Sequence, residues 1–581
     1  MTTTDETKPA SGETPPPPGW VKAAKRYGPI VAVVALIAGA VVVFGGGGDD
    51  DSDGDTSEAG SSTQEQLILA GPMTPERAEL EGETDVDFGP NCDTDTGRIM
   101  LPTVYAPPCV EPFVGDNGGA TSPGVSADTV KVVYYQTDPA LDPLTAATVE
   151  GAGADVDPNS AAETVRNFVD LYNETFETYG RTIEVELFTG TGGPDDGEAA
   201  RADAIGIAEK EPFAVIGGPQ QSIPIFSSEL ASRGVVCASF CATALPEQIV
   251  EDSHPYVWPS GATPQQGAAL AAEMIGKLAG PGPAALAGDS AMQSEERVYA
   301  LLHYDTPEGD YQPVFEALRD ALGDNGVELA TDIEFTLDLA RAQENARTYI
   351  GQLKAAGVTT VIYQGDPLTP ASLTAEATAQ GYFPEWILGP SVLMDTTIFA
   401  RQTDPEQWKN GFGISLPGAR GERSTNGAFR IHEWAYGAPP PNNTANVLEP
   451  QVRLVFTGIH LAGAELTPES FRDGLLRYPV SGGGPTETQQ SRGDHGVWPD
   501  FDWGGTDDVA IIWFDPEATG EDEVGNEGTG MYRYANGGQR YTIGNLPSSL
   551  EEAGLFDVEA SVTVYDEVPE EDRAPDYSPP G

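Results

Sequence analysis

Apolar residues from Val125 onward alternate between short continuous runs and helical spacing. The run VKVVYY at 130–135 is nearly all apolar, which is typical of a parallel strand that is covered on both faces. Apolar side chains then recur three or four positions apart from about Ser160, where Ser160 and Glu163 form a capping box, and Gly180 ends the predicted helix. This order of strand and helix predicts a βα unit.

The alternation continues over two stretches of similar size. In the first, we expect strands at 182–188, 213–216 and 235–239, with helices near 198–209 and 224–232. The pattern restarts after HPYVWPSGATP (254–264), with strands expected at 297–303, 327–335 and 359–363 and helices at 313–322 and 341–356. Repeated βα units predict an α/β fold with two lobes, each a parallel sheet flanked by helices.

An uncharged segment precedes this α/β region. No charged residue occurs from Tyr27 to Gly48, and a helix over 27–48 would be about 33 Å long, enough to cross a bilayer core. Basic residues precede it and an acidic block follows it, so the positive-inside rule puts residues 1–26 in the cytoplasm as a tail. We therefore expect one uncleaved transmembrane helix, a single-pass protein of the cell membrane, and the bulk of the chain outside the cell.

Two alternative interpretations of this opening segment fit the residues less well. A cleaved export signal needs a small-x-small site after the apolar run, but Ala38-Gly39-Ala40 lies inside it. The acidic residues that begin at Asp49 match the first half of an EF-hand loop, yet Gly60 stands where its glutamate belongs. We interpret 49–64 as a disordered acidic linker and expect no metal site.

The strong negative charge of the chain argues against a nucleic-acid-binding function. The chain has 30 Lys and Arg against 91 Asp and Glu, a net charge of −61, and phosphate binding needs a cationic surface. We therefore expect no nucleic-acid partner.

The 4 cysteines predict two disulfides, and Cys92 with Cys109 and Cys237 with Cys241 is the simplest of three connectivities. The first pair lies in an N-terminal extension at 65–124, and the acidic tail at 546–581 is expected to fray.

Polar residues gather after the predicted strands, at the carboxyl ends where open α/β sheets bind ligands. They read QTD (136–138), GGPQQS (217–222), SFCAT (239–243), YDT (304–306) and QGD (364–366). Glycines let backbone N–H groups approach a ligand, and helix N-termini favour a carboxylate. The alternative is that these are ordinary βα turns, which favour the same residue types.

The chain carries no recognisable catalytic or cofactor motif. Walker A, HExxH and G-x-S-x-G patterns are missing from the sequence, and no histidine has a partner at metal-ligand spacing. We therefore expect no cofactor and no enzymatic activity. The rival hypothesis, a surface hydrolase, would need Ser222 or Ser239 as nucleophile with His303 as base.

The stretch from Val125 to about Tyr541 resembles the type I periplasmic binding proteins of the leucine/isoleucine/valine-binding kind, the extracellular receptors of ABC importers. The resemblance rests on the segments GVVCASFCATALPE (234–247), HPYVWPSGATPQQG (254–267), RVYALLHYDT (297–306), YQGD (363–366), GYFPEWILGPS (381–391) and LTPESFRDGL (466–475). The segment CDTDTGRIMLPTVYAPPCVEPF (92–113) is similar to an extension of membrane-anchored actinobacterial members.

The resemblance implies two lobes joined by three crossings, with a ligand bound between them by hinge closure and an ABC permease that reads the closed form. Lobe one would combine 125–258 with 390–500, and lobe two would combine 259–389 with 501–545. Family members that bind amino acids hold the ligand carboxylate near positions that match Gln221 or Ser222 and at Ala242 and Thr243. Tyr304 or Tyr311 would pack against the ligand.

One departure from the family concerns the ammonium group of an amino acid. The family places Glu after Gly-Pro at the second crossing, whereas Ser391 stands there in this chain. Either Asp366 takes the charge role or the ligand lacks an ammonium, because a buried ammonium without an acid would be costly. The full set of expected ligand-binding residues is Gln136, Gln221, Ser222, Ser239, Ala242, Thr243, Tyr304, Tyr311, Gly365, Asp366 and Ser391.

The sequence thus predicts a membrane-anchored extracytoplasmic receptor for a small polar ligand, such as an amino acid or an amide. A second interpretation remains open, in which the same domain is a sensory ectodomain that signals ligand state through a partner. The cytoplasmic tail expected at 1–26 is too short to hold a signalling domain of its own.

Overall fold

The computed structural model describes residues 64–306, 309–389, 393–425 and 427–580. Residues 62–581 form one compact unit. The predicted cytoplasmic tail and transmembrane helix lie outside the described residues, as does nearly all of the acidic linker. Within the described ranges, no helix combines the length and the apolar character needed to span a bilayer.

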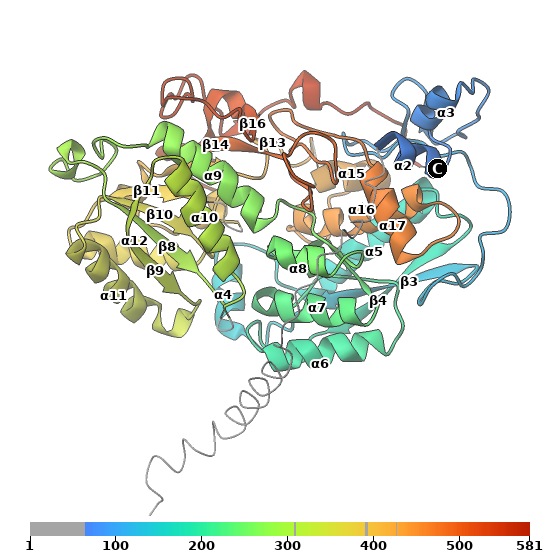
Figure 1. Cartoon of the computed structure of the whole chain (residues 1–581), viewed down its shortest axis with the longest axis horizontal. Helices are drawn as coiled ribbons and strands as arrows, with labels where there is room; N and C mark the ends of the chain where they lie inside the picture. The colour runs from blue at the N-terminus through green and yellow to red at the C-terminus, as the bar shows by residue number, and fades with distance from the viewer. Residues whose placement is uncertain (1–63, 307–308, 390–392, 426, 581) are drawn as a thin grey trace, which may run out of the picture. The chain divides into compact units, whose positions relative to one another are not determined.

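A five-stranded parallel sheet forms the centre of lobe one, in the order β4–β3–β5–β6–β7 (Figure 1). Its strands are β3 (Thr129–Gln136), β4 (Thr182–Thr189), β5 (Ala214–Ile216), β6 (Val236–Ala238) and β7 (Val257–Trp258). The four strands predicted in this region are confirmed within one or two residues at each end. Strand β3 pairs with β4 on one side and with β5 on the other, so the apolar run 130–135 is an interior strand, and helices on both faces of the sheet explain why both of its faces are apolar.

Helices cover both faces of this sheet. One face packs on α5 (Pro158–Thr175), α15 (Gly427–Tyr436), α16 (Ala445–Ala462) and α17 (Pro468–Arg477). The other face packs on α6 (Gly197–Ala208), α7 (Ile223–Ser232) and α8 (Glu247–Asp252). Helices α15 to α17 follow lobe two in the sequence, so lobe one is completed only when the chain returns to it.

The start of α5 differs from the prediction. Asp157, not Ser160, is the cap, because the Asp157 side chain accepts a hydrogen bond from the Asn159 N–H at 3.0 Å and Pro158 occupies the first turn. The Ser160 hydroxyl instead donates to Asp155 at 2.7 Å. The helix ends at Thr175, and Gly180 (φ 76°) lies in the turn that follows.

Lobe two contains an eight-stranded sheet in the order β15–β14–β12–β11–β10–β8–β9, with β16 also paired to β14. Its strands are β8 (Tyr299–Tyr304), β9 (Leu329–Phe335), β10 (Thr360–Gln364), β11 (Glu385–Leu388), β12 (Phe412–Ser415), β14 (Asp508–Glu521), β15 (Glu527–Tyr534) and β16 (Arg540–Thr542). One face packs on α9 (Pro264–Leu278) and α10 (Gln312–Asp324), and the other on α11 (Ala342–Ala355) and α12 (Thr369–Ala379). The three strands and two helices predicted here are confirmed.

The boundary expected between the lobes at 389/390 is wrong. Strand β12 pairs in parallel with β11 through Ile387↔Phe412, so the lobe-two sheet continues past residue 390. The short helices α13 (Thr397–Ala400) and α14 (Pro405–Trp408) also belong there, because Ala400 and Trp408 are buried in a lobe-two core cluster. The second crossing therefore lies between β13 (Arg420–Gly421) and α15.

The N-terminal extension docks on lobe one. It contains α2 (Gln64–Ala70), α3 (Pro75–Glu81), β1 (Cys92–Asp93) and β2 (Arg98–Ile99). Arg477 of α17 donates to the carbonyl of Leu67 at 2.7 Å, and the Tyr105 hydroxyl donates to the carbonyl of Thr488 at 2.8 Å. Both predicted disulfides, Cys92–Cys109 and Cys237–Cys241, are confirmed.

The C-terminal segment is packed, which corrects the expectation of a frayed tail. Leu546, Ala553 and Leu555 are buried in the lobe-two core, and β17 (Val564–Tyr565) pairs with β13 at the second crossing. Farther on, Trp434 of lobe one donates to the carbonyl of Tyr577 at 2.9 Å, and the Tyr577 hydroxyl donates to Asp93 of β1 in the N-terminal extension at 2.8 Å. The C-terminus and the N-terminal extension appear in the same part of the view in Figure 1. The acidic composition of the segment at 546–581 suggested a frayed tail, but several of the apolar residues within it are buried.

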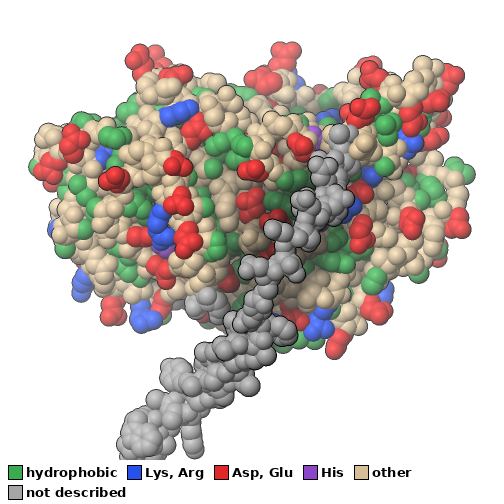
Figure 2. Space-filling view, viewed as in Figure 1, with side chains coloured by type: hydrophobic (Ala, Val, Ile, Leu, Met, Phe, Trp, Pro, Cys, Tyr) green, Lys and Arg blue, Asp and Glu red, His purple; other side chains and the backbone are tan. Residues whose placement is uncertain are grey.

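Acidic side chains are spread over the face of the molecule in Figure 2, where Lys and Arg are fewer. This distribution agrees with the net charge of −61. Mutual repulsion of such surfaces favours solubility.

Asp572 anchors the C-terminal segment and provides a test of its packing. Its carboxylate accepts hydrogen bonds from the Thr486 N–H at 2.6 Å and the Thr486 hydroxyl at 2.8 Å. We expect Asp572→Ala to lower the free energy of unfolding by about 1–3 kcal/mol in urea denaturation, because two buried donors lose their acceptor. The exposed neighbour Glu570→Ala is the control, and equal stability of the two variants would contradict the anchoring role.

Candidate functional site

The carboxyl ends of the lobe-one strands carry most of the predicted ligand-binding residues, and several of them are occupied by internal hydrogen bonds. The Ser222 hydroxyl donates to the carbonyl of Pro194 at 2.9 Å, and the Gln136 amide donates to the carbonyl of Pro158 at 2.8 Å. Ala242 is fully buried, whereas Gln221 and Thr243 are partly exposed. Ser222 and Gln136 therefore hold the loops of this edge in place.

Gln451 of α16 belongs to this edge and was missed from the sequence. Its side-chain oxygen accepts a hydrogen bond from the Gly217 N–H at 3.0 Å, which fixes the turn after β5. Gly217 has φ 73°, and a Cβ there would lie 2.1 Å from the carbonyl oxygen of Tyr135, so only glycine fits this turn. No local pattern on α16 distinguishes Gln451 from a helix surface residue.

Ser239 is the most unusual residue of the lobe-one edge. It is fully buried, its φ is 59°, and its hydroxyl has no hydrogen-bond partner among the described residues. The Cys237–Cys241 disulfide closes the turn in which it lies. A strained residue with an unsatisfied buried hydroxyl is typical of a binding site, because a bound polar group would restore the missing hydrogen bond.

The lobe-two edge is lined by aromatic side chains. The rings of Tyr304 and Tyr311 lie 6.0 Å apart, and Tyr304 lies 6.2 Å from Phe335, which stacks on Tyr363. A Cβ at Gly365 would lie 2.7 Å from the Phe335 ring, so a larger residue there would have to displace that ring. Burial raises the pKa values of Tyr304 and Tyr311, which keeps both phenols neutral.

Two polar atoms of this edge lack partners within the described ranges. The Tyr304 hydroxyl is buried without a hydrogen bond, and so is the side-chain oxygen of Gln364, a residue that is 6% exposed. Gln364 is the last residue of β10 and lies beside Gly389. A Cβ at position 389 would lie 3.3 Å from the Gln364 Cβ, so the glycine leaves room for the Gln364 side chain. Gln364 directly precedes Gly365 and Asp366 in the sequence but is not among the expected ligand-binding residues.

The carboxylates of the lobe-two edge are held by their own loops. Asp366 lies three residues before α12, and its carboxylate accepts from the N–H groups of Leu368 and Thr369 at 2.8 Å and from the Thr369 hydroxyl at 2.7 Å. Burial raises its pKa. Asp305 is fully buried and accepts from the N–H groups of Thr306 and Tyr311. Ser391 lies outside the described residues.

An apolar contact joins the two lobes near these edges. The segment after β3, which contains α4 (Pro143–Gly151), lies between the lobes in Figure 1, and its Ala154 is buried together with Ile398 and Phe399 of lobe two. Leu368 packs on the same cluster, two residues beyond Asp366. The loop that follows β3 therefore reaches the loops that follow β10 and β11.

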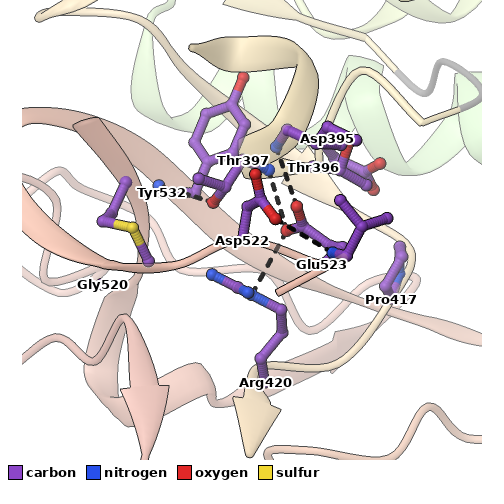
Figure 3. Close-up of polar contacts among 12 residues, drawn as sticks. Asp395, Thr396, Thr397, Pro417, Arg420, Gly520, Asp522, Glu523 and Tyr532 are labelled. Carbon is purple, nitrogen blue, oxygen red and sulfur yellow. Dashed lines mark hydrogen bonds and ion pairs between the residues drawn. The ribbon is translucent and has the colours of Figure 1, made fainter. Parts of the chain in front are cut away.

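A polar cluster holds the lobe-two segment after Leu393 (Figure 3). The Glu523 carboxylate accepts from the N–H groups of Thr397 and Ile398 at 2.9 Å and lies 3.3 Å from the Arg420 guanidinium of β13. Asp395 accepts from Ser415 and Leu416 at 3.0 Å, and burial raises its pKa to about 6. These contacts tie the segment to the β14–β15 hairpin and to the second crossing.

The residues required by a hydrolase do not come together. His303 lies in the helix-covered face of lobe two, with its Nε2 2.8 Å from Asp332 and its ring 3.9 Å from that of Phe315. Ser222 and Ser239 are in lobe one, and Ser222 is bonded to Pro194. No group of three or more His, Cys, Asp or Glu side chains in the described part of the chain is arranged to hold a metal ion.

Comparison with known proteins supports the fold. No protein-family model matches the chain, and no curated protein matches it. The leucine-, isoleucine-, valine-, threonine- and alanine-binding protein of Brucella ovis, in a closed conformation, is 12% identical with a TM-score of 0.50, covering 73% of this chain and 98% of its own. A periplasmic binding protein of Burkholderia mallei is 12% identical with a TM-score of 0.48, covering 75% and 98%.

A third solved structure is the fatty acid ABC transporter substrate-binding protein of Thermomonospora curvata, which is 16% identical with a TM-score of 0.45, covering 77% of this chain and 99% of its own. At 12% identity the Brucella ovis structure bears on the fold alone. Together with the two helix-flanked sheets and the three crossings between them, the Brucella ovis comparison shows that the chain has the two-lobed α/β fold of the type I periplasmic binding proteins.

Proposed function

We propose that the chain is a solute receptor that binds a small polar molecule between its two lobes and delivers it to an ABC permease. The observation that carries this proposal is the set of buried polar atoms without partners at the strand ends of both sheets, namely the Ser239 hydroxyl, the Tyr304 hydroxyl and the Gln364 amide oxygen. Each such atom costs about 1–3 kcal/mol while it is unsatisfied, and a ligand that bonds to it recovers that energy.

Hinge closure is the mechanism that this fold favours. The three crossings connect the lobes on one side, and the apolar cluster of Ala154, Ile398 and Phe399 connects them beside the strand ends. A ligand that contacts both edges binds better when they are close, so binding shifts the population toward the closed form. A permease that contacts both lobes would recognise that form.

The residues of the site favour an uncharged polar group as the main recognition element. Hydroxyl and amide atoms are unpartnered, whereas the carboxylates of Asp305 and Asp366 already accept three hydrogen bonds each. The Brucella ovis structure is named for the amino acids it binds, so amino acids and their amides are the first candidates. The family has an acid that pairs with the ligand's ammonium at the position where this chain has Ser391. A ligand without an ammonium would not need that acid.

We further propose that residues 27–48 anchor the receptor in the cell membrane, with the two lobes outside the cell. The uncharged length of this segment and the charge difference across it support the proposal. The two disulfides fit an oxidising compartment outside the cytosol.

A thermal-shift screen against amino acids, amides, short peptides and organic acids tests the receptor function. A ligand that binds only the folded protein should stabilise it by about 2.7 kcal/mol at a hundredfold excess over its Kd. Release of a chemically changed product in the same samples, followed by mass spectrometry, would contradict a receptor without catalysis.

Variants of the unpartnered hydroxyls test the location of the site. With a ligand from the screen, we expect Ser239→Ala and Tyr304→Phe each to weaken binding about tenfold in calorimetry, because each loses one buried hydrogen bond worth about 1 kcal/mol or more. Exposed residues of the same types provide the controls, Ser228→Ala and Tyr436→Phe. Unchanged affinity in both site variants would place the ligand elsewhere.

A further inference from the structure

The first and third crossings are joined directly by hydrogen bonds. The Gly505 N–H donates to the carbonyl of Gly261 at 3.0 Å, and the Gln266 amide donates to the Asp502 carboxyl at 2.6 Å. The Arg492 guanidinium donates to the carbonyl of Pro259 at 2.9 Å. Any rotation of one lobe against the other must be accommodated at this junction, because the chain passes here from lobe one to lobe two.

Two buried acids lie within this junction. Asp502 is 1% exposed and Asp507 is fully buried. Asp502 accepts from Gln266 and from the Gly504 N–H at 2.8 Å, and Asp507 accepts from the Ser491 hydroxyl at 2.8 Å. The Oδ2 of Asp502 and the Oδ1 of Asp507 have no donor among the described residues. Both acids flank the segment 489–493, because the Asp507 N–H donates to the carbonyl of Gln489 at 2.9 Å and Asp502 exchanges two backbone hydrogen bonds with Gly493. The neighbouring Asp502 also raises the pKa of Asp507.

The charges around the pair can neutralise only one carboxylate. Arg492 is 4% exposed and attracts Asp502, while burial lowers its own pKa. His495 faces Asp507, but burial lowers the pKa of the imidazole, so it is neutral at physiological pH. Tyr478 faces Arg492, and the remaining polar neighbours, Gln266, Gln489 and Ser491, are uncharged. Two ionised carboxylates in this setting would repel each other across a short distance.

We propose that Asp502 and Asp507 share one proton, and that this proton holds the first and third crossings together, so that its loss in alkaline solution loosens the hinge. The shared proton supplies the missing donor for both unpartnered oxygens. Without it, two like charges face each other where the Gly505–Gly261 hydrogen bond joins the crossings. The device would make the hinge more mobile at high pH whatever the ligand is.

The sign of the pH dependence follows from the direction of the pKa shift. Burial and the neighbouring Asp502 raise the pKa of Asp507 to about 8, whereas an unfolded aspartate titrates near its ordinary value. The folded protein therefore keeps a proton that the unfolded chain has lost between about pH 4 and pH 8. The contribution of the pair to stability is complete below this window, and it is lost progressively as pH rises through the window.

The test compares denaturation of the full-length protein and its variants from pH 6 to pH 9. We expect the unfolding constant of the wild type, relative to that of Asp507→Asn, to rise about tenfold per pH unit up to pH 8 and then to level off. Asp502→Asn is a second variant, because its amide can donate to Asp507 in place of the shared proton, and it should flatten the profile in the same way. Asp500→Asn, an exposed acid two residues away, should keep the wild-type profile.

Amide exchange at the junction supplies the readout for hinge loosening. After correction for the intrinsic pH dependence of exchange, the Gly505 N–H should exchange at least tenfold faster at pH 9 than at pH 6 in the wild type and at similar rates in Asp507→Asn. Parallel stability profiles for wild type and both junction variants would overturn the shared proton. A flattened stability profile without any change in Gly505 exchange would overturn its role in the hinge.

Discussion

The packing of α16 against the sheet of lobe one is the constraint on which the rest of the structure depends. This helix is buried along most of its length, and the ring of Phe456 lies 5.6 Å from those of Tyr172 on α5 and of Phe176, which directly follows α5. Burial of one large apolar side chain contributes about 1.5–3 kcal/mol, so lobe one cannot leave this face open. Because α16 follows lobe two in the sequence, the chain must cross between the lobes more than once, and a hinge results.

Charged side chains that are partly or fully buried lie where the chain makes these crossings. Arg420 and Glu523 lie at the second crossing, and Asp502, Asp507 and Arg492 lie at the junction of the first and third. A buried charge is costly unless its partners are held in place, so such groups specify one geometry more than they add stability. The C-terminal segment covers the second crossing through β17, which limits the access of water to these groups.

The candidate site differs from the crossings in kind. Its edges carry aromatic rings, glycines in tight turns and hydroxyl or amide groups without partners. The carboxylates of Asp305 and Asp366 already accept hydrogen bonds from backbone N–H groups. The polar atoms without partners are therefore neutral at the candidate site, namely the Ser239 and Tyr304 hydroxyls and the Gln364 amide oxygen, whereas at the crossings they belong to charged or titratable groups such as Asp502, Asp507 and Arg492.

Sequence periodicity alone determined the α/β class, four of the five strands of lobe one, three of the eight strands of lobe two, and the carboxyl ends at which to look for a site, because strand and helix spacing is a local property. The tertiary structure alone decided that β12 extends lobe two past residue 390, that the acidic C-terminal segment is packed, and that the Asp366 carboxylate is buried against the loop before α12. Each of these depends on contacts between residues far apart in the chain, which no local pattern records. The same holds for Gln451 and for the pair Asp502 and Asp507, since burial and neighbouring charge, not residue type, give them their roles.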